Sequence, residues 1–128
     1  MRFLHTMLRV RDLDKELAFF TQALGMKVLR RQEYHEGRFT LVFVGYGDES
    51  NHTVLELTYN WDTDDYEIGN AFGHIAIEVQ DASKACERVR SLGYVVKREA
   101  GPMKHGTTII AFCSSPTGYL VEFIEKIS

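Results

Sequence analysis

One pattern occurs twice in the chain, and this repeat constrains the fold more than any other feature. "FLHTMLRVRD" at residues 3–12 and "FGHIAIEVQD" at residues 72–81 each contain a histidine, then alternating apolar residues, then Val-x-Asp. His74 follows His5 by 69 residues, and Asp81 follows Asp12 by the same 69 residues. The spacing predicts two copies of one small structural unit within the 128 residues.

Each copy is predicted to form a strand, a helix and then three strands. Apolar residues at helical spacing follow Asp12 and Asp81, which suit helix N-caps, and Gly25 and Gly93 suit the position just past each helix. Runs rich in Val, Thr, Ile and Phe then predict strands at 26–32, 39–44, 53–59, 94–98, 107–113 and 119–125.

A unit with one helix can cover only one face of a four-stranded sheet, so two copies are expected to share a core or enclose something between them. We therefore expect one α+β domain over residues 1–128, built from two repeats at about 1–60 and 74–128. The polar, glycine-containing segment 61–73 is the expected linker.

Composition argues against several classes of function. The formal net charge of -3 argues against binding to nucleic acid or to an anionic membrane, because phosphates require a concentrated positive field. Apolar runs are short and interrupted, so we expect neither a signal peptide nor a membrane span. Cys86 and Cys113 have neither the number nor the spacing of a disulfide framework. We expect two reduced, packed thiols and a cytoplasmic protein.

Two histidines and two glutamates stand at equivalent places in the repeat. His5 and His74 lie in the first strands, while Glu56 in "VLELT" and Glu122 in "LVEFI" lie between apolar residues of the last strands. Taken singly, each is best read as a structural or solvated residue. Together they favour a site for nickel, cobalt, zinc or iron, since a carboxylate in an apolar strand needs a partner. The remaining histidines are expected at the solvated surface: His35, His52 and His105.

The chain resembles the short bacterial form of the glyoxalase I family, in the vicinal oxygen chelate superfamily. The resemblance covers nearly all of it, through "LHTMLRVRDLDKELAFFTQALGMKVLR", "FVGYGDE", "LELTYNWD", "GNAFGHIAIEVQDA", "REAGPMKHGTTIIAF" and "GYLVEFIE". It implies paired βαβββ modules, two per chain, with sheets curving around a metal site. It also implies a homodimer in which each active site is shared between subunits.

The resemblance also implies roles for individual residues. The metal ligands fall on His5, Glu56, His74 and Glu122, with one divalent ion per site. Nickel is the first choice, because short chains of this kind resemble the nickel- or cobalt-activated class, and cobalt or zinc are the alternatives. The expected contacts to glutathione are Arg9, Asn60, Arg98, Lys104 and the lid residue Met103. Where some relatives carry an arginine ahead of the second histidine, this chain has Asn70.

The activity implied is that of a lyase acting on 2-oxoaldehydes. The hemithioacetal of methylglyoxal and glutathione is isomerised to S-D-lactoylglutathione through a metal-stabilised enediolate, with Glu122 as the main base and Glu56 able to act on the other face of the substrate. Alternatives within the superfamily are an extradiol dioxygenase, an acyl-CoA epimerase, or a protein that only binds a metal or a small molecule. A second liganding glutamate argues against the dioxygenase.

Overall fold

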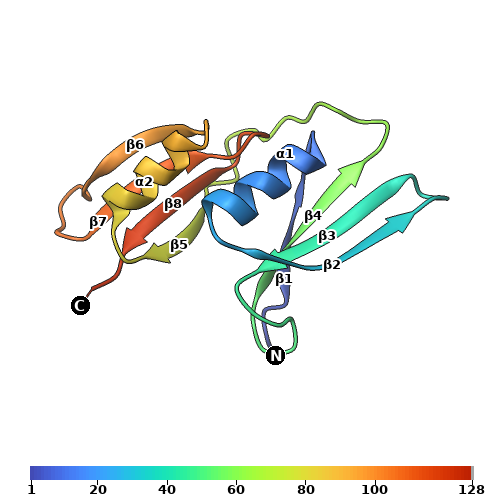
Figure 1. Ribbon diagram of the computed structural model, residues 1–128, viewed down its shortest axis with the longest axis horizontal. Coiled ribbons are helices and arrows are strands. Elements are labelled where there is room, and N and C mark those ends of the chain that lie inside the picture. Colours follow the sequence, from blue (N-terminus) through green and yellow to red (C-terminus); the bar gives the residue numbers. More distant parts are fainter. Residues whose placement is uncertain (128) are drawn as a thin grey trace. The chain divides into compact units, whose positions relative to one another are not determined.

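The computed structural model describes residues 1–127 and divides into two compact units, Met1–Glu67 and Ile68–Ser128. The division falls inside segment 61–73, where the sequence predicts a linker. The predicted order of strand, helix and three strands is present in both units, which confirms the α+β class with βαβββ modules (Figure 1).

In unit 1 the strands are β1 (His5–Arg9), β2 (Lys27–Tyr34), β3 (Phe39–Gly45) and β4 (Val54–Asn60). They form one sheet in the order β1-β4-β3-β2. β1 pairs with β4 in parallel, and the other neighbours are antiparallel. The first and last strands of the unit therefore lie side by side and run in the same direction.

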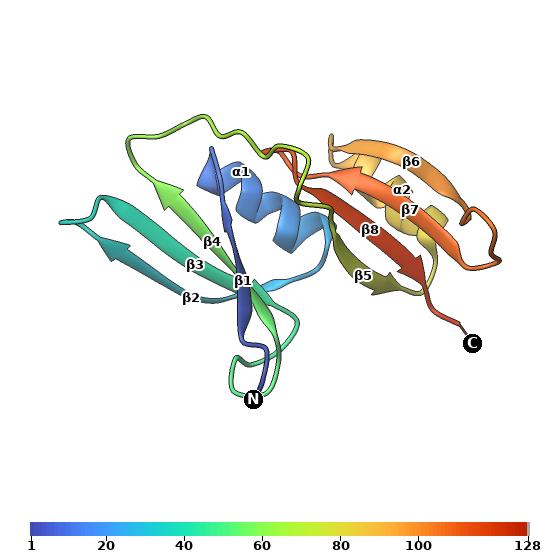
Figure 2. The same cartoon turned by 180° about the vertical axis from the view of Figure 1, so that it is seen from behind.

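Unit 2 repeats this topology with β5 (Ile75–Val79), β6 (Val95–Pro102), β7 (Ile109–Ser114) and β8 (Leu120–Glu125). The order is β5-β8-β7-β6, and β5 pairs with β8 in parallel. Its helix α2 (Ala82–Ser91) packs on β6, β7 and β8, on one face of the sheet (Figure 2). The opposite face of each sheet is left for other contacts.

The helix ends form as the sequence predicts. The side chain of Asp12 accepts a hydrogen bond from the backbone N–H of Lys15, and that of Asp81 accepts one from Lys84. These bonds satisfy N–H groups that lack partners within the first helical turn. Gly25, with φ of 74°, turns the chain out of the first helical segment in a backbone conformation that suits glycine.

The first helical segment departs from a regular α-helix. It begins as α1 (Leu13–Ala18) and continues as a π-helical turn, η1 (Phe19–Ala23). The hydroxyl of Thr21 donates to the carbonyl of Leu17, four residues back, and the N–H of Leu24 reaches the carbonyl of Phe19, five residues back. Phe19 and Phe20 are both fully buried in this wider turn, and their rings meet edge to face with centroids 5.1 Å apart.

Apolar side chains fill the core of each unit. The largest fully buried ones in unit 1 include Phe19, Phe20 and Leu57, and in unit 2 Phe123, Val89 and Val121. Cys86 and Cys113 are buried free thiols, as predicted. Within the described part of the chain, no helix is long and apolar enough to cross a membrane.

The two thiols should be unreactive in the folded protein. Burial raises the pKa of Cys113 to about 12, and it raises the pKa of Cys86 as well. A raised pKa leaves little thiolate at pH 8, and the thiolate is the species that reacts. Iodoacetamide at pH 8 should therefore label neither cysteine in the native protein but both in guanidinium chloride, as measured by intact mass. Fast labelling of the native protein would contradict this burial.

Candidate metal centre

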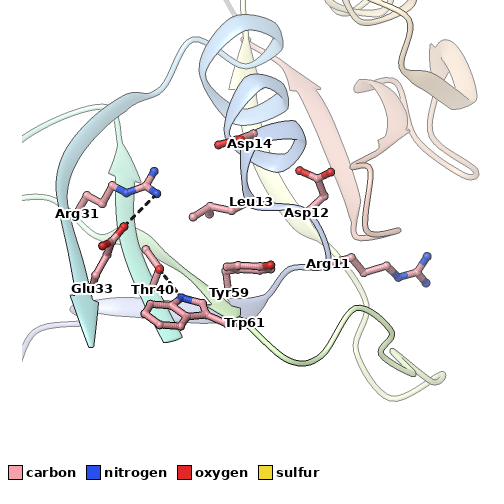
Figure 3. Close-up of a pocket in the computed structure, with 9 residues that line it drawn as sticks. All are labelled: Arg11, Asp12, Leu13, Asp14, Arg31, Glu33, Thr40, Tyr59 and Trp61. Carbon is pink, nitrogen blue, oxygen red and sulfur yellow. Dashed lines mark hydrogen bonds and ion pairs between the residues drawn. The ribbon is translucent and has the colours of Figure 1, made fainter. Parts of the chain in front are cut away.

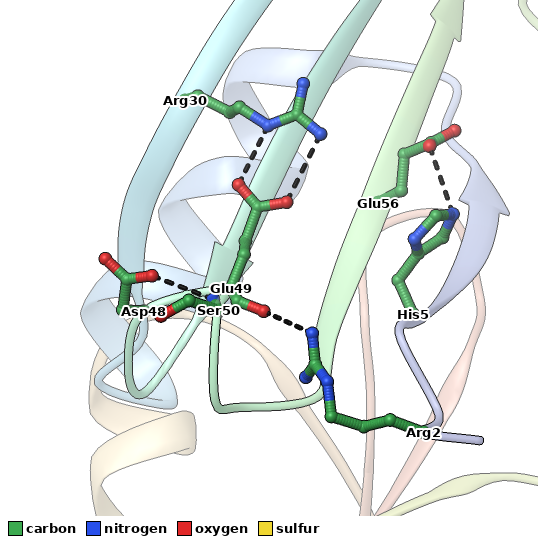
Figure 4. Close-up of polar contacts among 7 residues, drawn as sticks. All are labelled: Arg2, His5, Arg30, Asp48, Glu49, Ser50 and Glu56. Atoms are coloured by element: carbon green, nitrogen blue, oxygen red, sulfur yellow. Dashed lines mark hydrogen bonds and ion pairs between the residues drawn. The ribbon is translucent and has the colours of Figure 1, made fainter.

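Parallel pairing of first and last strands places a histidine beside a glutamate in unit 1. Met7 lies opposite Glu56 in the β1–β4 register, and His5 is two residues before Met7, so all three side chains share one face of the sheet. The Nε2 atom of His5 lies 3.4 Å from Oε1 of Glu56 (Figure 4). The neighbouring Leu55 and Leu57 point to the other face and are buried.

Unit 2 holds the same pair. Ala76 lies opposite Glu122 in the β5–β8 register, and His74 directly precedes β5. The Nε2 atom of His74 lies 3.2 Å from Oε1 of Glu122. Side-chain exposure also matches, with 15% for Glu56 and 14% for Glu122, so both carboxylates are largely shielded yet reachable.

An aromatic ring supports each histidine. Phe43 meets His5 edge to face with ring centroids 5.4 Å apart, and Phe112 meets His74 in the same way at 5.1 Å. Each phenylalanine is also the cross-strand partner of the glutamate in its unit. Sequence reasoning missed these rings, although Phe43 and Phe112 have the same spacing of 69 residues as the two histidines.

The chemistry of the donors fits a divalent transition metal. Imidazole nitrogen and carboxylate oxygen each lie about 2.0–2.2 Å from a zinc-like ion, so two ligands of one ion lie about 3 Å apart. The two measured separations, 3.4 and 3.2 Å, match this requirement. Among residues 1–127, no group of three or more His, Cys, Asp or Glu side chains is placed to hold an ion. Each unit offers one His–Glu pair as candidate ligands.

The two glutamates differ in what holds them. Oε2 of Glu56 accepts a hydrogen bond from the hydroxyl of Thr58 at 3.1 Å. Ile124 stands two residues after Glu122, at the corresponding place in β8, and offers no hydroxyl. Glu56 is therefore restrained at a second oxygen by its own strand, and Glu122 has no such restraint.

The predicted glutathione contacts on unit 1 share the His5 face of the sheet. Arg9 lies opposite Thr58, and Asn60 is two residues further along β4 on the same face. The side-chain amide of Asn60 donates to the hydroxyl of Tyr66 at 2.9 Å.

The predicted contacts on unit 2 lie in and beyond β6. Arg98 donates hydrogen bonds to the carbonyls of Gly101, Ile110 and Pro102, at 3.3, 2.9 and 2.8 Å. Its guanidinium thus holds the irregular part of the β6–β7 pairing. Lys104 and Met103 are exposed in the loop between these strands, and Asn70 is exposed ahead of His74.

The other histidines lie at the surface, as the sequence predicts. His105 is exposed in the β6–β7 loop. Its φ of 64° is a left-handed backbone conformation that residues other than glycine seldom adopt. His35 and His52 are also exposed.

A cavity of about 420 Å³ lies on the helix side of the unit 1 sheet and contains none of the predicted site residues (Figure 3). Its walls include the start of α1 and the side chains of Arg31, Glu33, Tyr59 and Trp61. Arg31 faces Glu33 at 3.7 Å, and the indole of Trp61 donates to Thr40, so these polar groups already have partners.

Comparison with known proteins agrees with the fold. A family model described as the Glyoxalase/Bleomycin resistance protein/Dioxygenase superfamily matches residues 2–123. The chain belongs to this superfamily. It is 66% identical to the lactoylglutathione lyase of Neisseria meningitidis, over 100% of this chain and 93% of that one. It is 57% identical to the lactoylglutathione lyase of Salmonella typhimurium, over 98% of this chain and 93% of that one.

Solved structures give the same result. Glyoxalase I from Zea mays superposes with a TM-score of 0.96 at 42% identity, over 99% of this chain and 45% of the maize chain. The trypanothione-dependent glyoxalase I of Leishmania major superposes with a TM-score of 0.87 at 43% identity, over 98% of this chain and 86% of that chain.

Proposed function

We propose that this chain is a lactoylglutathione lyase, which converts the hemithioacetal of methylglyoxal and glutathione into S-D-lactoylglutathione. The observation that carries the proposal is the repeated His–Glu pair, His5 with Glu56 and His74 with Glu122, at nearly equal spacing. It occurs in a chain that shares 56–66% of its residues with several full-length relatives named for this activity.

Four residues of this chain would hold the metal: His5, Glu56, His74 and Glu122. When bound, a divalent metal supplies Lewis acidity that stabilises negative charge developing on the substrate's oxygens. We propose nickel as the native ion, with cobalt or zinc as alternatives, because two imidazoles and two carboxylates suit a metal of borderline softness.

In the proposed reaction a carboxylate moves the proton. Glu122 takes a proton from the carbon next to the carbonyl, which leaves an enediolate, and returns it to the neighbouring carbon. In its own strand, Glu122 has no hydrogen bond like the one that Thr58 donates to Glu56. This greater freedom supports its role as the main base, because the base must reach two neighbouring carbons in turn. Glu56, held by Thr58 at 3.1 Å, is the more fixed of the two and can act on the other face of the substrate.

Glutathione is proposed to bind along the His5 face of unit 1 and the β6–β7 loop of unit 2. Arg9 and Asn60 would hold its carboxylate and peptide groups, Lys104 would add a cation, and Met103 would cover the bound substrate. Arg98 would contribute through the shape of the loop that it braces as well as through its charge. Because one similar structure is named for trypanothione, activity with glutathione should be compared with activity with other thiols.

We further propose a homodimer in which each site takes His5 and Glu56 from one subunit and His74 and Glu122 from the other. Each unit supplies only two ligands, and this chain spans 45% of the maize chain, which has room for two chains of this size. The two units of one chain are proposed to act as one domain. The cytoplasm is the proposed location, since buried free thiols suit a reducing compartment.

Removing the metal should abolish activity without unfolding the protein, because each unit has an apolar core of its own. Chelator-treated protein should keep its circular dichroism spectrum and show no formation of thioester from methylglyoxal and glutathione. Nickel or cobalt should restore turnover, and zinc should restore little. Full activity of the metal-free protein would disprove the metal proposal.

The substitution Glu122→Gln tests the base. The amide keeps the size of the side chain and one oxygen but cannot accept the proton, so kcat should fall by at least about 100-fold. Nickel affinity, measured by calorimetry, should fall much less. Glu87→Gln, an exposed change on α2 that removes the same charge, is the control and should leave kcat unchanged. Near-normal turnover of Glu122→Gln would remove this residue from the role of base.

Mixed dimers test the shared site. His5→Ala and Glu122→Ala should each be nearly inactive alone. In a mixed dimer one site carries both defects and the other is intact. Random reassortment gives half mixed dimers, so co-refolding should restore roughly a quarter of wild-type activity. If each site were built within one chain, no rescue would occur, and a mixture as inactive as its components would exclude sharing.

A further inference from the structure

We propose that Arg30 is a positioning residue for His5, acting through Phe43 and through the loop at residues 46–53. Arg30 lies on β2, two strands away from β4, and Figure 4 draws no hydrogen bond or ion pair from it to His5 or Glu56. The inference rests on the proposed metal site and adds a residue that supports it.

The first contact is with the ring that supports the histidine. The guanidinium carbon of Arg30 lies 3.8 Å from the centroid of the Phe43 ring. A cation at this distance over an aromatic face is attracted to it and limits its motion. The same ring meets His5 edge to face, with centroids 5.4 Å apart. Arg30 therefore contacts the ring that packs against the imidazole of His5.

The second contact is with the loop that carries Glu49. Nε and Nη2 of Arg30 donate to the two carboxylate oxygens of Glu49, at 2.8 and 3.2 Å (Figure 4). Two parallel bonds from a planar guanidinium define the position of the carboxylate better than one bond does. The loop is thereby tied to β2.

The same loop holds the segment that leads into His5. Arg2 donates to the backbone carbonyl of Glu49 at 2.8 Å, and the hydroxyl of Thr53 donates to the carbonyl of Phe3 at 2.8 Å. The N–H of Val54 also donates to the carbonyl of Leu4 at 3.1 Å. Fixing Glu49 therefore fixes the backbone just before His5, so that Arg30 restrains the histidine from two sides.

The second repeat does not use its counterpart in this way. Arg98 lies opposite Phe112 in the β6–β7 register, as Arg30 lies opposite Phe43. However, its guanidinium donates to three backbone carbonyls instead of to a carboxylate on a loop. The contacts of Arg30 with Phe43 and Glu49, which we call the clamp, are thus a feature of the His5 half of the proposed site.

The test compares Arg30→Met with Arg31→Met in the full chain. Arg31 is the next residue of β2, faces Glu33 at 3.7 Å on the other side of the sheet, and has nearly the same side-chain exposure, 46% against 50%. Both substitutions remove one positive charge, so the general effect of charge on binding a cation has the same direction in both variants. Glu49→Gln opens the clamp while changing the charge in the opposite sense.

If Arg30 positions His5, the nickel affinities of the variants should follow a pattern that a change of charge alone cannot produce. Arg30→Met and Glu49→Gln should both weaken nickel binding, by about 10-fold for Arg30→Met. Simple charge effects would strengthen binding in the first variant and weaken it in the second. Arg31→Met should bind nickel as tightly as wild type or slightly more tightly. Binding by Arg30→Met as tight as that by Arg31→Met would overturn the proposal.

NMR of the metal-free protein separates this inference from the proposed function. The imidazole signals of His5 should shift or broaden in Arg30→Met, while those of His74 stay unchanged and Arg31→Met alters neither. Wild-type protein that bound no nickel would disprove the metal site, yet the His5 signals would still decide whether Arg30 positions the ring. Unchanged His5 signals in Arg30→Met would refute the clamp.

Discussion

The structure depends on parallel pairing between the first and last strands of each unit. An antiparallel hairpin could place neighbouring strands together directly, but β1 and β4 run in parallel and require the helix and two further strands between them. This topology brings a histidine from one end of the unit beside a glutamate from the other. The N-cap aspartates, the glycine with φ of 74° and the buried helix face all serve to return the chain to the sheet.

The repeat produces two similar His–Glu pairs that differ in their surroundings. In unit 1 the hydroxyl of Thr58 donates to Glu56, and Arg30 binds Glu49 and contacts Phe43. In unit 2 Ile124 takes the place of Thr58, and Arg98 donates to backbone carbonyls. In the reaction that we propose, this difference would suit the transfer of a proton between adjacent carbons, because the more restrained pair would keep the proposed metal in place while the base moves. The two His–Glu pairs thus share a geometry but differ in how firmly their glutamates are held.

Much of the fold and of the candidate site could be predicted from the sequence, because the repeat shows which residues of the two units occupy equivalent positions. The order of elements, the caps at Asp12 and Asp81 and the phase of the strands all depend on local patterns, which is why they were confirmed. The π-helical turn at Phe19–Ala23 depends on how two adjacent rings pack, which periodicity does not encode. Arg30 shows the same limit: nothing in "LRRQE" says which arginine meets Glu49 and which faces the opposite side.

The most direct test of the account is to locate the ion by anomalous scattering at the nickel edge in crystals of the nickel-loaded protein. We predict one peak per chain, within bonding distance of His5 Nε2 and Glu56 of one subunit and of His74 and Glu122 of the partner subunit. A single shared ion would account for the one His–Glu pair in each unit, with separations of 3.4 and 3.2 Å. A peak at other residues, or no ordered peak at full nickel loading, would contradict the account.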